Sequence, residues 1–315
     1  MRNLTKFAVA GIAAAAIVVP LASVSAGINH APAGVTHTSY SGFGSAPVSL
    51  GRIYMPTVQA HRNFGKTRPD TAPLTYRNGA VLTVPEEYII LWGFKGATDP
   101  DKIAKLMKAY AKVYGGSAIA GVLTQYYQVV GGTTTYISNP THNVKVWEDN
   151  ADAVPAHASD SQVQAEAWAG VQHFNGGTAD PNGAYIVVSP YHHDPQGFLS
   201  SGWCAYHGAS SKSGQTISYT NMPYMPDGGS SCGANFVSPP NDETGQDEGF
   251  TIVLNHEYSE SVTDPNPPSG WYNNSFGEIG DECAWTNIQN DPFGAKSYTM
   301  QPEYSNKTAS CVHSL

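Results

Sequence analysis

The segment from Phe250 to Trp285 constrains the fold of this chain more than any other stretch. It opens with the apolar residues FTIVL, which predict a helix over 250–262 with its first half buried in a core. The proline-rich stretch that starts at Pro265 ends this helix, because proline lacks an amide hydrogen and restricts the residue before it. The chain then returns through GEIGDEC, where Gly277 and Gly280 allow close backbone approach. The fold must therefore bring this returning segment back toward a half-buried helix.

The polar residues of this helix have the spacing of a metal site. His256 and Glu260 are four residues apart and lie on one face, with Glu257 beside them. In HExxH metallopeptidases two histidines bind zinc and the glutamate is the general base. Here the fifth position is glutamate, which can bind Zn²⁺ but also suits the harder ion Ca²⁺. The motif predicts a metal centre whose metal is Zn²⁺, with Ca²⁺ as the alternative.

A catalytic zinc site needs a third protein ligand, and three of the acidic residues that follow the helix are candidates: Asp264, Glu278 and Asp281. Asp281 is the preferred third ligand, because it lies on the returning segment, where Gly277 and Gly280 allow tight approach of the backbone, and Glu278 is the second choice. Asp264 directly precedes the prolines and is interpreted as a helix-end group. The competing interpretation is a structural histidine on an amphipathic helix, since the short HExxE pattern also arises by chance.

The N-terminal segment predicts export. Residues 1–26 combine Arg2 and Lys6 with an apolar run and end in Val-Ser-Ala, the pattern of a signal peptide cleaved after Ala26. An uncleaved anchor is the alternative, but Gly11 and Pro20 interrupt a run that is short for a membrane span. The mature protein is expected to be soluble, secreted and extracellular, with no membrane association after cleavage.

The four cysteines fit an oxidising compartment. Four cysteines allow three pairings, and closeness in sequence favours Cys204 with Cys232 and Cys283 with Cys311. A bridge at Cys283 would also fix the segment that carries Asp281.

The distribution of charge excludes two classes of partner. All five arginines lie in the first 77 residues, whereas the chain from residue 78 onward has nine lysines and 24 of the 25 acidic residues. Nucleic acids and anionic membranes require basic surfaces. We therefore expect neither as a partner of the main domain.

The chain is expected to form one α+β domain, with a central sheet and flanking helices, over residues 74–315. Residues 27–73 are rich in Gly, Ser, Ala, Pro and His and predict either a flexible leader or a pro-segment whose basic patch docks on the acidic domain. Strands are expected at 80–84, 88–92, 129–137, 184–189, 215–224 and 298–300, and helices from Asp99-Pro100 to Val113, at 117–127 and at 161–174 with Asp160 or Ser161 as cap.

Three histidines follow the expected strand 184–189. His207 is a candidate to stabilise a transition state, and His192 and His193 are weaker candidates because most isolated histidines have no site role.

Several of these segments together resemble one family. They are Trp92-Gly93, His173-Phe174, Tyr185-Ile186-Val187-Val188, Cys204-Ala205-Tyr206-His207, the HEYSE motif, Asp264-Pro265, Trp271-Tyr272 and Glu278-Ile279-Gly280-Asp281-Glu282-Cys283. Their order over residues 74–315 resembles the Exordium or phosphate-induced protein family of secreted proteins, and especially its bacterial and fungal members. The resemblance implies that His207, His256, Glu257, Glu260, Glu278, Asp281 and the cysteines occupy motif positions. It implies association with the cell wall and no defined catalytic activity.

Three functions follow as hypotheses. The first is a secreted zinc peptidase that acts on extracellular polypeptides, with His256, Glu260 and Asp281 as ligands, Glu257 as general base, and His207 or a nearby tyrosine at the oxyanion. The second is a non-catalytic protein that binds cell-wall polymers and carries a structural metal. The third is a glycoside hydrolase with a carboxylate pair such as Glu257 and Asp281, which would not depend on metal.

Overall fold

The centre of the fold is a pair of parallel strands that are buried on both faces. β3 (Glu86–Trp92) pairs with β7 (Gly183–Val188) along their lengths. Their continuous apolar sequences, YIILW and AYIVV, are typical of strands that are covered on both sides. The computed structural model describes residues 52–65, 73–95, 98–238, 241–274 and 277–315, which all belong to one compact unit.

These strands belong to a mixed six-stranded sheet with the order β1-β8-β9-β7-β3-β6. β9, β7, β3 and β6 run parallel to one another, whereas β8 is antiparallel to both β9 and β1. The other strands of the sheet are β1 (Arg52–Pro56), β6 (Val144–Asp149), β8 (Trp203–Lys212) and β9 (Gln215–Met222). Four antiparallel pairs lie outside it: β2 (Thr75–Tyr76) with β10 (Trp271–Tyr272), β4 (Tyr127–Val130) with β5 (Thr133–Tyr136), β11 (Gln289–Phe293) with β12 (Lys296–Met300), and β13 (Glu303–Ser305) with β14 (Ser310–Val312).

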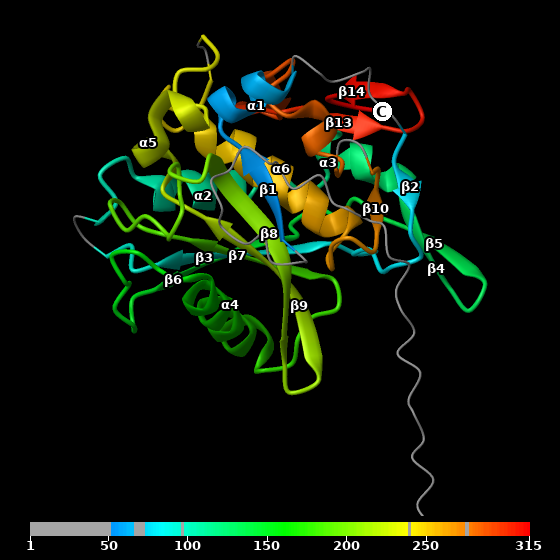
Figure 1. Ribbon diagram of the computed structural model, residues 1–315, viewed down its shortest axis with the longest axis horizontal. Coiled ribbons are helices and arrows are strands. Elements are labelled where there is room, and N and C mark those ends of the chain that lie inside the picture. The colour runs from blue at the N-terminus through cyan, green and yellow to red at the C-terminus, as the bar shows by residue number, and fades with distance from the viewer. Residues whose placement is uncertain (1–51, 66–72, 96–97, 239–240, 275–276) are drawn as a thin grey trace, which may run out of the picture. The chain divides into compact units, whose positions relative to one another are not determined.

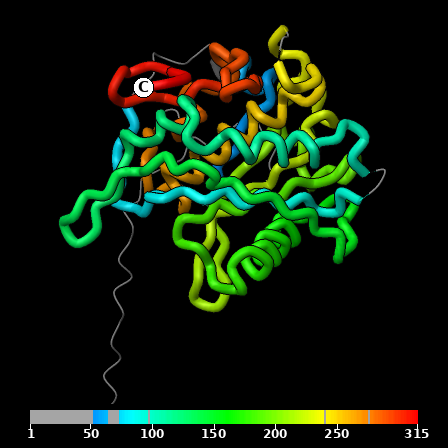
Figure 2. Tube along the Cα trace, turned by 180° about the vertical axis from the view of Figure 1, so that it is seen from behind, coloured from blue at the N-terminus to red at the C-terminus, as the bar shows by residue number. Residues whose placement is uncertain are grey.

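Two long helices cover opposite faces of the sheet (Figures 1 and 2). Successive side chains of a strand point to opposite faces. On β8, Tyr206 donates to Asp160 at the start of α4 (Asp160–Asn175), whereas His207 contacts Glu257 of α6 (Glu248–Thr263). The shorter helices are α1 (Val58–Gly65), α2 (Ile103–Tyr110), α3 (Ala118–Gly121), α5 (Met225–Gly228), η2 (Val122–Gln125), η3 (Gly229–Cys232) and η4 (Asp281–Cys283). The expected α+β fold with flanking helices is confirmed.

The helix expected at 250–262 is present as α6 and ends as the prolines predict. Every residue of α6 is buried, so its polar residues lie inside the protein and not on an exposed face. The helix expected at 161–174 is α4, and its N-cap is Ser159, whose amide donates to Gln162. The caps proposed from sequence, Asp160 and Ser161, are therefore one or two residues too late.

Three other local predictions were wrong. Residues 80–84 form no strand, because the amides of Val81 and Leu82 donate to Gln128 and to the end of α6. Residues 129–137 form a hairpin and not one strand, because Gly131 and Gly132 both have positive φ and make a two-residue turn. The helix expected from Asp99 begins only at Ile103, although the Asp99 carboxylate still accepts from its first amide.

Both expected disulfides are present. We call Cys204–Cys232 the β8 disulfide and Cys283–Cys311 the η4 disulfide; each joins residues 28 apart in sequence. Among the described residues, no helix has the length and apolar character needed to cross a membrane. The signal predicted for 1–26 lies outside the described residues.

Part of the segment that the sequence placed before the main domain packs against it. Within 27–73, the described residues 52–65 form β1, the edge strand of the sheet, and α1.

Candidate metal centre

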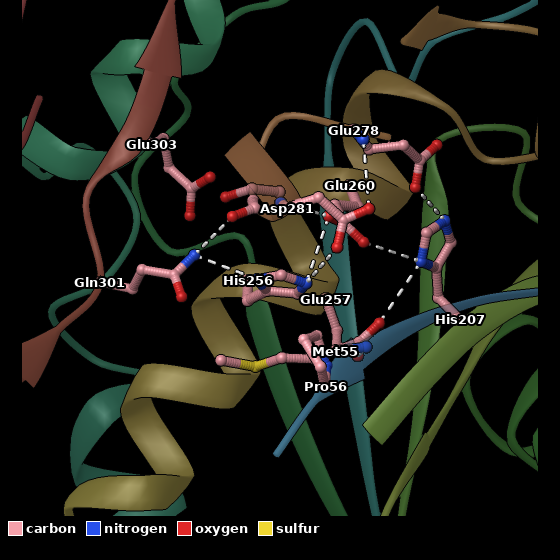
Figure 3. A network of polar contacts seen from close by, with 12 residues as sticks. Met55, Pro56, His207, His256, Glu257, Glu260, Glu278, Asp281, Gln301 and Glu303 are labelled. Carbon is pink, nitrogen blue, oxygen red and sulfur yellow. Dashed lines mark hydrogen bonds and ion pairs between the residues drawn. The ribbon is translucent and has the colours of Figure 1, made fainter. Parts of the chain in front are cut away.

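Residues from two distant segments converge beside α6. His256 and Glu260 lie one turn apart, with His256 Nε2 at 3.2 Å from Glu260 Oε1. Asp281, at the start of η4, places Oδ1 at 3.8 Å from the same nitrogen, and its amide donates to Glu260 Oε1 at 3.0 Å. One ligand atom from each of the three lies within 4.8 Å of the others (Figure 3). The structure thus brings together the three residues that the sequence favoured as ligands.

A second group shares Glu260 with the first. It consists of His207 from β8, Glu257 and Glu260, whose ligand atoms also lie within 4.8 Å of one another. His207 Nδ1 lies 3.3 Å from Glu257 Oε2 and 3.4 Å from Glu260 Oε2. Glu260 therefore directs one oxygen to each group.

Glu278 belongs with the second group and not with His256. Its Oε2 lies 3.2 Å from His207 Nε2, and its carboxyl group also contacts those of Glu260 and Asp264. Asp264 accepts from the amide of Ser269, in keeping with a helix-end role. His207 is consequently held between carboxyl groups on both sides of its ring (Figure 3).

The cluster contains five carboxyl groups with almost no contact with water. They are Glu257, Glu260, Asp264, Glu278 and Asp281, each at most 1% exposed. In the described part of the chain, no lysine or arginine forms an ion pair with Glu257, Glu260 or Glu278. Burying one unpaired carboxylate costs several kcal/mol, whereas a whole domain is stable by only about 5–15 kcal/mol. The cluster must therefore either keep protons or hold a cation.

The pKa values of these carboxyl groups point the same way. Burial raises the pKa of Glu257 to about 8, although its hydrogen bond with His207 opposes the shift. Burial also raises the pKa of Glu260 to about 8 against the lowering effect of the Asp281 amide, and it raises the pKa of Glu278 well above its usual value. A divalent cation can replace such protons, because carboxylate ligands bind metal in their ionised form. The donor set fits Zn²⁺, and its many oxygens also suit Ca²⁺.

Close approach of the backbone holds His256 in place. A Cβ atom added to Gly280 would lie 2.6 Å from His256 Nδ1 and 3.0 Å from Glu260 Oε1. The glycine expected to permit tight approach is therefore packed directly against two of the candidate ligands.

Two contact residues were missed from the sequence. Gln301 Nε2 lies 3.0 Å from His256 Nδ1 and donates to the carbonyl of Gly280, so it orients the ring. Glu303 on β13 is buried nearby and accepts from Asn255 of α6 at 2.6 Å. Neither residue stands in a recognisable motif, and only the path of the C-terminal segment past α6 brings them here.

The weaker histidine candidates lie elsewhere. His192 Nδ1 lies 3.4 Å from Asp227 Oδ1, and His193 Nδ1 lies 3.1 Å from the carbonyl of Pro155.

Comparison with models of protein families, with curated proteins and with solved structures finds no match to this chain. The resemblance to the Exordium family therefore stays a prediction.

Proposed function

We propose that this protein is a secreted metal-dependent peptidase, with zinc as the metal. The observation that carries the proposal is the convergence of His256, Glu260 and Asp281, whose ligand atoms lie within 4.8 Å of one another beside a glutamate that follows the histidine. Export is supported by the predicted signal and by two disulfides, which are typical of secreted proteins.

His256, Glu260 and Asp281 would hold the zinc ion, and three protein ligands are the number that catalytic zinc sites use. A bound zinc ion supplies Lewis acidity and lowers the pKa of a coordinated water. Glu257, in its ionised form, would accept a proton from the attacking water at its carboxylate and pass it to the leaving amine. His207 Nδ1 lies 3.3 Å from this carboxylate, and His207 Nε2 lies 3.2 Å from Glu278 Oε2. In the proposed mechanism His207 therefore orients Glu257, in place of the oxyanion role expected from sequence.

Glu257→Gln tests the general base. The variant should keep zinc, because Glu257 is not one of the three ligands, and should lose at least about 100-fold in casein hydrolysis. His256→Ala should lose zinc and hydrolysis together. Metal content by mass spectrometry and casein digestion are measured on the same samples.

Glu166→Gln is the matched control. Glu166 is another buried glutamate with a pKa raised to about 8 by burial, but it lies on α4 across the sheet. This variant should keep both zinc and activity. Full activity in Glu257→Gln would refute the proposed mechanism.

A structural metal is the second candidate, and the burial of the cluster favours it. Every candidate ligand is at most 1% exposed, so substrate has no direct access in this arrangement. A structural role predicts stoichiometric metal and a lower melting temperature after chelation, with no hydrolysis by the wild-type protein.

A further inference from the structure

β1 covers the candidate centre from the edge of the sheet. It pairs antiparallel with β8, the strand that carries His207, in the register Ile53 with His207 and Met55 with Ala205 (Figure 1). The side chain of Met55 is fully buried. Figure 3 shows Met55 and Pro56 next to Glu257.

The contacts of β1 with the site come from its backbone. The Met55 amide lies 3.4 Å from Glu257 Oε1, and the Pro56 carbonyl accepts from Trp285 Nε1 at 2.7 Å. Main-chain contacts of this kind do not depend on side-chain identity. A site that receives polypeptides of varied sequence needs such contacts, because pairing to an exposed strand edge supplies affinity through the backbone.

β1 is also the element that can leave without removing a ligand. α6 supplies His256, Glu257 and Glu260, η4 supplies Asp281, and β8 supplies His207. β1 supplies none of these side chains, and its contacts here are those of the Met55 amide and the Pro56 carbonyl. Its departure would turn β8 into an edge strand with free backbone groups next to the metal ligands.

We propose that the edge of β8 is the binding site for an extended polypeptide substrate and that β1 occupies this site as an intramolecular inhibitor. The inference rests on the proposed peptidase function. A substrate paired in the same register presents a peptide nitrogen to Glu257 where the Met55 amide now lies, which is where the general base must deliver a proton.

Arg52 provides a way to loosen β1 without altering the catalytic groups. Its guanidinium forms an ion pair with Asp160 at 3.2 Å and stacks over the ring of Tyr206 at 5.2 Å. In Arg52→Glu both contacts become unfavourable, and Arg52→Ala is the milder variant. Lys145→Glu is the control at the opposite edge of the same sheet, where Lys145 pairs with Glu86 at 2.9 Å and lies over the ring of Tyr88.

Three measurements on the full-length protein test the inference. Hydrogen exchange should show the amides of residues 52–58 exchanging at least about tenfold faster in Arg52→Glu than in wild type or Lys145→Glu. A fluorescent peptide of sequence RIYMPTV, residues 52–58, should bind Arg52→Glu by anisotropy and bind wild type much more weakly. Casein hydrolysis by Arg52→Glu should rise several-fold and be inhibited by the same peptide.

The outcomes separate this inference from the proposed function. Unchanged exchange in both Arg52 variants, or faster exchange without peptide binding, would overturn the inference and make β1 an ordinary edge strand. Peptide binding without casein hydrolysis in any form would leave the β8 site standing as a polypeptide-binding site and would refute the peptidase function.

Discussion

Gly280→Ala should weaken metal binding without removing any ligand. Gly280 has φ −77° and ψ −39°, so alanine adopts this backbone without strain and the effect is purely steric. The new Cβ would lie 2.6 Å from His256 Nδ1 and 2.8 Å from its Cγ, whereas carbon contacts settle near 3.5–4.0 Å. The imidazole must therefore move by about 1 Å.

The size of the effect follows from this displacement. Overpacking of a buried site costs about 1–3 kcal/mol of the free energy of unfolding. Disturbed orientation of a ligand costs about 10–100-fold in metal affinity, and a displacement of about 1 Å costs about 100-fold in rate. Zinc affinity is measured by calorimetric titration against a competing chelator, and stability by scanning calorimetry of the metal-free protein.

Two glycine variants separate the steric effect on the site from a loss of stability. In Gly170→Ala the Cβ would lie 2.3 Å from Ile90 Cδ1 in the core beneath α4, so stability should fall while zinc affinity is unchanged. In Gly121→Ala the nearest atom, Asn139 Nδ2, is 3.6 Å away, so neither quantity should change. Wild-type zinc affinity in Gly280→Ala would refute the close packing of η4 against His256.

Two further predictions concern stability. Burial raises the pKa of Glu243 to about 8, above the value near 4.3 of a free glutamate, so the folded state binds the extra proton and loses stability as pH rises from about 4.3 to 8. Glu243→Gln should therefore raise the free energy of unfolding by about 1–3 kcal/mol at pH 9 and change it little at pH 4 in urea titrations, and an equal gain at both pH values would contradict the assigned cause. Replacing both cysteines of the η4 disulfide by serine should cost about 3–4 kcal/mol and also lower zinc affinity, because that bridge anchors the helix that carries Asp281. The β8 disulfide spans the same sequence separation, so its removal should cost similar stability, and equal loss of zinc affinity in both variants would argue against a specific role for the η4 disulfide.

Features that depend on near neighbours in the chain could be predicted from the sequence. Apolar residues followed by prolines set the limits of α6, and the spacing of His256 and Glu260 put both on one face of it. Short separations favoured the two disulfides that form, and Gly277 and Gly280, just before Asp281, indicated the tight return of this segment to the helix. These signals are local, because helix periodicity, proline chemistry and short loops act over a few residues to a few tens of residues.

The surroundings of this site depend on contacts between residues that are far apart in the chain. The contact between Met55 and Glu257 joins residues 202 apart, and that between Gln301 and His256 joins residues 45 apart. No sequence pattern in these segments predicts either contact, because both contacts result from the packing of the sheet and of α6. The burial of the helix could not be predicted either. An HExxE helix has the same sequence pattern whether one of its faces contacts water or, as here, the whole helix lies inside the protein. Burial by strands from distant parts of the chain raises the pKa values of the carboxyl groups. Pairing with β8 places β1 beside Glu257.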